Sequence, residues 1–69
     1  DILAEILSKD TWKRTDLSNL SKKRGLILGS LLEKINDYSY SKVDDAVIED
    51  DGDTLYVNVE YKKELLKAP

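Results

Sequence analysis

The sequence predicts a small α+β domain that is mainly α, with three helices, a β-hairpin and a C-terminal helix. Apolar residues recur at helical spacing through residues 2–42 and then alternate with polar residues over residues 55–59. The aspartate–glycine pair at residues 51–52 separates two short apolar runs and is typical of a hairpin turn. A chain of 69 residues has room for one core only, so we expect a single domain over residues 1–69.

Composition excludes several classes of protein. The chain has no cysteine and no histidine, which rules out disulfide scaffolds, zinc sites built on thiolate or imidazole, cysteine nucleophiles and histidine-based triads. No apolar run approaches the roughly 18 residues that a membrane span needs, and no signal peptide opens the chain, so we expect a cytoplasmic protein. Asp1 is not a methionine and a periodic segment begins at once, so we expect a piece of a longer protein.

The opening residues predict a short amphipathic helix that ends near residues 8–10, from the spacing of Ile2, Leu3, Ile6 and Leu7. Trp12 is the one tryptophan of the chain and follows this helix directly. We expect its ring to be largely buried where the helices meet, in contact with Leu17, Leu20 and Ile35.

Residues 15–25 carry clear start and stop signals for a second helix. Thr15 is a good N-cap, and Asp16 falls in the first turn, where the helix dipole favours a negative charge. Gly25 supplies the left-handed residue that ends the helix, and Leu26 follows where a Schellman motif places an apolar contact back onto Leu20.

A longer helix is predicted at about residues 29–42. Ser30 and Glu33 have the spacing of a capping box at its start, although the apolar pattern already begins at residues 27–28. The expected inward face consists of Leu28, Leu31, Leu32, Ile35 and Tyr38.

The period of the pattern then changes from helical to alternating. We expect extended runs at residues 46–48 and 55–59, joined by a turn over residues 50–53 whose Asp-Gly pair suits a type I′ turn. Asn58 is expected to cap a final helix through Tyr61, Leu65 and Leu66. Three helices followed by a hairpin is also a winged-helix-like order of elements.

Charge argues against nucleic acid despite this order. Residues 1–42 hold eight basic and six acidic side chains, for a charge of +2, whereas residues 43–69 hold three basic and eight acidic, for −5. The outward face of the third helix would present Ser30, Glu33, Lys34, Asp37 and Ser41, and the wing tip would be acidic. Phosphate binding depends on lysine and arginine, so we expect no DNA binding. The basic run at residues 22–24 keeps nucleic acid as a third hypothesis, although a helix C-terminus attracts cations anyway.

The acidic hairpin is the one candidate for a chemical site, through the residues Glu49, Asp50, Asp51 and Asp53. Carboxylates around a glycine turn can supply oxygen ligands to Ca²⁺ or Mg²⁺. The spacing does not match an EF-hand loop, because the residue six past Gly52 is Asn58 rather than glutamate. Two interpretations remain: a solvated turn whose charge keeps the sheet edge from pairing, and a weak divalent-cation site.

Other polar residues suggest no further site. Glu33 and Asp37 lie one helical turn apart, but no base, nucleophile or apolar pocket accompanies them, so we expect a solvated surface and no catalysis. The tyrosines are expected to complete the small core, since their rings bury area while their hydroxyls reach water. The alternative is that Tyr40 and Tyr56 stay exposed as part of a docking surface.

The order of several short segments resembles a known family. These segments are Trp12, Leu17, Leu20, Gly25-Leu26, the stretch Gly29-Ser30-Leu31-Leu32-Glu33-Lys34-Ile35-Asn36-Asp37 and the stretch Val47-Ile48-Glu49-Asp50-Asp51-Gly52. Over about residues 2–66 the chain resembles the TerB-C domain, the C-terminal module of larger bacterial proteins that contain a tellurite-resistance TerB-like region.

The resemblance implies context more than mechanism. It implies a domain from the C-terminal part of a larger stress-response protein, whose relatives are sometimes linked to ATPase or helicase-like partners. A metal-associated role is suggested for the wider group, and only Glu49, Asp50 and Asp51, with nearby Asp53, match an acidic stretch of this module.

We therefore predict a non-catalytic accessory or interaction module that binds other domains of its parent protein or a protein partner. The alternative function is divalent-cation binding by the acidic hairpin, and no other cofactor is expected.

Overall fold

The computed structural model describes residues 2–67, which form helices, one 3₁₀ helix and three strands. In chain order they are α1 (Ile2–Ile6), β1 (Thr11–Lys13), α2 (Arg14–Lys23), α3 (Leu28–Val43), β2 (Ile48–Asp51), β3 (Thr54–Val57), the 3₁₀ helix η1 (Val59–Tyr61) and α4 (Lys62–Leu65). The predicted α+β, mainly α fold class is confirmed.

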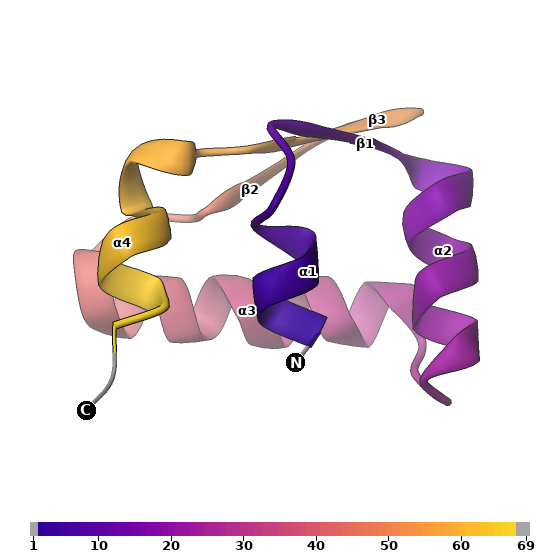
Figure 1. Cartoon of the computed structure of the whole chain (residues 1–69), viewed down its shortest axis with the longest axis horizontal. Coiled ribbons are helices and arrows are strands. Elements are labelled where there is room, and N and C mark those ends of the chain that lie inside the picture. The colour runs from indigo at the N-terminus through magenta and orange to yellow at the C-terminus, as the bar shows by residue number, and fades with distance from the viewer. Residues whose placement is uncertain (1, 68–69) are drawn as a thin grey trace.

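The three strands form one antiparallel sheet in the order β1-β3-β2, with the hairpin strand β3 in the centre. Figure 1 shows this sheet on one side of the molecule and the long helix α3 running along the other. The short helix α1 lies between them in the middle, while α2 and α4 stand at the two ends of α3 (Figure 1) and both contact it. The chain thus wraps helices around one face of a small sheet.

The core lies between the sheet and α3, and it takes apolar side chains from every helix and from both strands of the hairpin. Its fully buried members are Ile6, Leu7, Leu17, Val47 and Leu55, and its nearly buried members are Leu31, Ile35, Ile48, Val57 and Leu65. The alternation expected in the hairpin is present, because Leu55 and Val57 are buried while Tyr56 between them is exposed. The burial of this cluster is the main stabilising term of the fold.

Strand β1 was not predicted, and it changes the place of Trp12. The strand pairs with β3, and Trp12 lies opposite Leu55. As expected, most of the Trp12 side chain is buried, and it packs against the core cluster that includes Leu17 and Ile35. The Lys9 ammonium lies over the ring, 3.7 Å from its centroid. Trp12 Nε1 donates to the Ile6 carbonyl at 2.8 Å, so the indole closes the end of α1.

The predicted end of α2 is confirmed, but its predicted start is wrong. Gly25 has φ +70°, and the amides of Gly25 and Leu26 donate to the carbonyls of Lys22 and Ser21 at 3.0 and 2.9 Å, which is the Schellman pattern. At the start, Thr15 is no cap: the helix begins at Arg14, and no side chain caps it. The Arg14 amide instead donates to the Asp53 carbonyl at 2.8 Å, so the hairpin turn replaces the cap.

Helix α3 begins one residue before its predicted start, and the predicted capping box does not form. Ser30 and Glu33 are exposed within the helix, and no side chain caps its first turn. The inward face also differs from the prediction at its end, where Ser39 is buried and Tyr38 is 37% exposed. The Ser39 hydroxyl donates to the Asp45 carbonyl at 2.6 Å, so the loop after α3 satisfies this buried polar group.

The hairpin forms, but its turn lies one residue further along the chain than predicted. Gly52 and Asp53 are the two loop residues between the paired Asp51 and Thr54. Gly52 has φ +71° whereas Asp53 has no positive φ, which is the pattern of a type II′ turn and not of type I′. Both strands also differ from their predicted bounds: β2 begins at Ile48 and not at residue 46, and β3 ends at Val57 and not at residue 59.

The final helix starts differently from its prediction. Val59 belongs to η1 and not to the strand, and the Asn58 side chain makes no cap. Asn58 Nδ2 donates to the Ala46 carbonyl at 2.9 Å instead, which holds the entry to β2 against the exit from β3.

Candidate functional site

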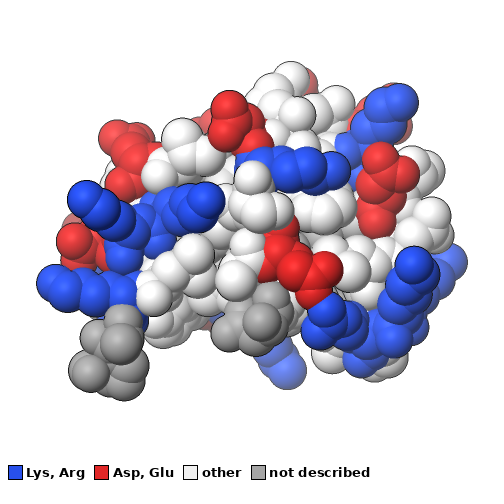
Figure 2. Space-filling model, viewed as in Figure 1, with Lys and Arg blue, Asp and Glu red and all other residues white. Residues whose placement is uncertain are grey.

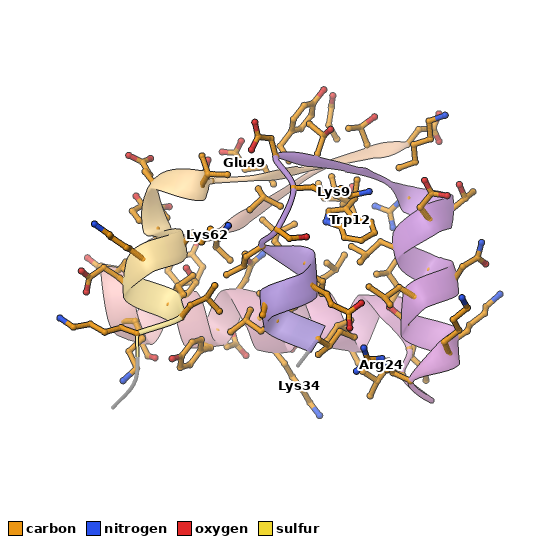
Figure 3. The ribbon with its side chains drawn as sticks, viewed as in Figure 1. Lys9, Trp12, Arg24, Lys34, Glu49 and Lys62 are labelled. Atoms are coloured by element: carbon orange, nitrogen blue, oxygen red, sulfur yellow. The ribbon has the colours of Figure 1, made fainter. Side chains whose placement is uncertain are left out.

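Three of the four acidic residues of the predicted site are divided between the two faces of the sheet, and the fourth, Asp53, lies in the hairpin turn. Asp50 lies opposite the buried Leu55, whereas Glu49 and Asp51 lie opposite Tyr56 and Thr54 on the outer face. Figure 3 shows Glu49 on the side of the sheet away from α3. Strand alternation therefore separates these carboxylates.

The carboxylate of Asp50 is already paired with Arg14. Its Nη2 forms an ion pair with Asp50 Oδ2, and its Nε donates to the Gly52 carbonyl at 2.6 Å. Asp50 Oδ1 also accepts the Gly52 amide at 3.0 Å. The hydrogen bond from Arg14 lowers the pKa of Asp50, and the same bond raises the pKa of Arg14. This contact joins the hairpin turn to the first residue of α2, and sequence reasoning did not anticipate it.

Within residues 2–67, no group of three or more acidic side chains is placed to hold a metal ion. Asp53 is exposed in the turn, Asp51 is exposed directly before it, and Glu49 lies on the outer face of the strand. Cation binding by Glu49, Asp50, Asp51 and Asp53 stays a prediction, and the arrangement favours few protein ligands for any one ion.

A second acidic residue, Asp45, organises the loop between α3 and β2. Its Oδ1 accepts the Ala46 amide at 2.8 Å, and its Oδ2 accepts the Tyr61 hydroxyl at 2.6 Å. The bond from Tyr61 is the main cause that lowers the pKa of Asp45, and it raises the pKa of Tyr61 to about 12. Asp44 before it has φ +58°, a conformation that aspartate tolerates better than most residues. An Asp-Asp pair directly after a helix was the available signal for this turn.

Asparagine and serine side chains fasten the same loop to α3. Asn36 Nδ2 donates to the Ile48 carbonyl at 3.1 Å, and Asn36 Oδ1 accepts the Ile48 amide at 3.0 Å. Ser39 and Asn58 bond the carbonyls of Asp45 and Ala46. The described polar residues around this loop therefore have a structural role.

Basic side chains gather at the two ends of the molecule, over the end of α2 and over α4, as Figure 2 shows. At the end of α2, Lys22 and Lys23 are exposed and Arg24 forms an ion pair with Glu5 of α1. At α4, the side chains of Lys62 and Lys63 are exposed. Neither of these α4 lysines forms an ion pair with a residue that the structure describes.

Apolar side chains are exposed beside both basic ends. Ile27, in the turn between α2 and α3, is 76% exposed, and Leu26 before it is exposed as well. Val59 and Leu66 flank the α4 lysines and are 47% and 37% exposed. Together with Glu60 and the two lysines they line a surface hollow of about 470 Å³.

The tyrosines divide between the two predicted uses. Tyr61 packs against the core, as expected for a ring that completes it. Tyr40 and Tyr56 are exposed, which agrees with the alternative expectation for these two rings. Their part in docking stays a prediction.

None of the helices in the described part of the chain has the length and apolar character that crossing a bilayer requires. Comparison with known proteins found no match among curated proteins and none among solved structures. A family model, the TerB-C domain, matches residues 1–66, which is nearly the whole chain. The resemblance carried by Trp12, the glycine–leucine turn and the Ile35-Asn36-Asp37 segment is thereby confirmed, and the chain belongs to the TerB-C domain family.

Proposed function

We propose that this TerB-C domain is a non-catalytic interaction module of a bacterial tellurite-resistance-type stress-response protein, and that it binds other domains of that protein or a protein partner. The observation that carries the proposal is the pairing of exposed apolar side chains with exposed lysines at both ends of α3. Exposed apolar groups rimmed by polar ones are typical of protein-binding surfaces.

The electrostatics of the acidic residues support the same proposal. The clearest pKa shifts belong to Asp45 with Tyr61 and to Asp50 with Arg14, and each pair holds one loop to a helix or strand. A catalytic carboxylate requires a cleft and a substrate-facing position. Both pairs are open to solvent and stabilise the loops that contain them. A non-catalytic role therefore accounts for their pKa shifts.

Mixing the isotopically labelled chain with the remainder of its parent protein tests the proposal. We expect a complex, detected by sedimentation, and amide shifts concentrated near the exposed apolar residues at the ends of α3. The absence of a complex at roughly millimolar concentration would contradict the proposal. A measurable turnover by the isolated chain, lost on Asp45→Asn or Asp50→Asn, would contradict the non-catalytic part.

A further inference from the structure

We propose that the outward face of η1 and α4, formed by Val59, Lys62, Lys63 and Leu66, is a docking site for an acidic amphipathic protein helix. These four residues form the terminal-helix face. The inference rests on the proposed interaction function and deepens it, since it names the surface and the chemistry of the partner.

Val59 begins η1, Lys62 and Lys63 begin α4, and Leu66 follows its last residue. All four line the same surface hollow, so they lie on one side of this segment. The opposite side is already used, because Leu65 is 2% exposed and Tyr61 packs against the core. Val59 and Leu66, on the other side, lie outside the core cluster and remain 47% and 37% exposed. The hollow of about 470 Å³ lies over this exposed apolar pair.

Charge specifies the partner. Lys62 and Lys63 lie between the two apolar residues along the helix, and no described residue forms an ion pair with either. Figure 3 shows Lys62 on α4 at one end of the molecule. Lysine stems cover apolar surface while their ammonium groups remain in water. A helix that presents two apolar side chains two turns apart, with carboxylates between them, matches this pattern in both shape and charge.

A second copy of the chain does not match. An antiparallel pairing of two terminal-helix faces would place Val59 of one copy against Leu66 of the other. The lysines of both copies would then meet at the centre of the contact, where like charges repel.

Phosphate surfaces match less well than a protein helix does. Glu60 lines the same hollow, and Glu64 lies one turn further along the segment. A run of phosphates or an anionic bilayer would meet these carboxylates with the same sign of charge. A protein helix can carry a basic residue opposite Glu60 and acidic residues opposite the lysines.

The turn between α2 and α3 provides a matched comparison. Lys22, Lys23 and Ile27 repeat the combination of lysine and exposed apolar side chain, but they line neither the hollow of about 470 Å³ nor the one of about 330 Å³ beside Arg14. Variants at this end change the net charge of the chain by the same amount and leave the terminal-helix face intact.

The experiment titrates the chain with a synthetic helical peptide that has leucines two turns apart and glutamates between them. We expect amide shifts over residues 59–66 and binding that falls at least about tenfold in the double variant Lys62→Glu with Lys63→Glu. The control double variant Lys22→Glu with Lys23→Glu should bind the peptide as the parent chain does. A peptide with lysines in place of the glutamates should regain affinity for the Lys62→Glu, Lys63→Glu variant, and this rescue also shows that the variant is folded.

Several results would overturn the inference. These are equal losses in the two double variants, no binding of the acidic peptide at roughly millimolar concentration, or self-association that disappears in Leu66→Ser. Stronger binding to vesicles rich in anionic lipid than to the peptide would replace the protein partner with a membrane. If the remainder of the parent protein binds the parent chain and the Lys62→Glu, Lys63→Glu variant equally, this surface is wrong while the interaction function stands. If the peptide behaves as expected but the parent protein does not bind, the interaction function alone is contradicted.

Discussion

Asn36 illustrates how much of this fold rests on a single amide side chain. It lies on α3, half-buried, and it bonds both the amide and the carbonyl of Ile48 at the edge strand of the sheet. A carboxamide has a donor and an acceptor side by side, so it can take the place of a neighbouring strand for one residue. The bond pair holds β2 against α3 and covers part of an open sheet edge.

Replacing Asn36 by leucine should lower the free energy of unfolding by about 1–3 kcal/mol, because two backbone groups of Ile48 lose their partner. Urea denaturation followed by circular dichroism measures the change. Asp37→Asn is the matched control, since its side chain is exposed on the next position of the same helix; its effect should stay within about 0.5 kcal/mol. Equal effects of the two substitutions would show that the Asn36 bonds contribute nothing.

The Asp45–Tyr61 pair should make stability depend on pH at both ends of the range. The pKa of Asp45 is lowered from 3.8, so its contribution is present above pH 3.8 and is lost as the pH falls through the lowered value. The pKa of Tyr61 is raised from 10.0 to about 12, so its contribution is present below pH 10.0 and is lost as the pH rises through about 12.

Nuclear magnetic resonance of the Tyr61 ring measures this directly. Asp45→Asn should bring the pKa of Tyr61 down from about 12 toward 10.0, because the carboxylate that disfavours the phenolate is gone. Asp44→Asn should leave the Tyr61 titration unchanged, since it alters the neighbouring residue and not the hydrogen bond. An unchanged titration in Asp45→Asn would show that the hydrogen bond does not form in solution.

At the scale of the elements, the boundary between α2 and α3 depends on the conformation of one glycine. Gly25 has φ +70° and lies in open space, so backbone conformation and not crowding decides what it tolerates. Gly25→Ala should therefore cost about 1–2 kcal/mol. Gly29, in the first turn of α3, also lies in open space but has no positive φ, so Gly29→Ala should be neutral or stabilise by up to about 1 kcal/mol. Thermal melts of the two variants should move in opposite directions or differ clearly in size, and similar losses would contradict the argument.

The hairpin should bind divalent cations weakly, if it binds them. Asp50 is already bonded to Arg14 and Gly52, and Glu49 and Asp51 face the other side of the sheet. A Ca²⁺ ion prefers 6–8 oxygens, so we expect an affinity in the region of ~1 mM and no dependence of the fold on metal. Amide shifts of residues 49–54 during Ca²⁺ and Mg²⁺ titrations measure it, with Asp53→Asn as a variant that removes one possible ligand. Saturation at micromolar Ca²⁺ with a large rise in melting temperature would favour the cation-binding function over the interaction module.

At the scale of the whole molecule, negative charge covers the surfaces that a winged helix would use on DNA. The predicted outward face of α3 is exposed throughout, and it includes Glu33 and Asp37 beside Lys34. Figure 3 shows Lys34 extending away from α3. Residues 49–53 of the hairpin are exposed and acidic as well.

The domain should therefore give no salt-sensitive shift of duplex DNA, because counterion release requires basic groups that face the phosphates. A gel shift and fluorescence anisotropy at micromolar protein measure this. Joint substitution of Lys22, Lys23 and Arg24 by glutamine should change nothing in the assay. A shift in the parent chain that this variant abolishes would return nucleic acid to consideration.

Local sequence was sufficient wherever a residue's own conformation or a regular period decides the structure. The stop of α2 at Gly25, the long helix α3 and a hairpin at Gly52 all follow from short-range steric preferences or from repeated apolar spacing. The ordered motifs around Trp12, Gly25 and Ile35-Asn36-Asp37 were likewise sufficient to predict the TerB-C family.

Tertiary structure alone decided the features that depend on residues far apart in the chain. Strand β1 is three residues long, too short to show a period, and it exists because Trp12 pairs with Leu55. The same strand brings Trp12 against the core, and the hairpin turn takes the place of the predicted Thr15 cap. The bonds of Asn36 to Ile48 and of Tyr61 to Asp45 carry no sequence signal of their own. Hydrogen bonds between distant segments arise only once hydrophobic burial has brought those segments together, so spacing along the chain could predict the elements but not these contacts.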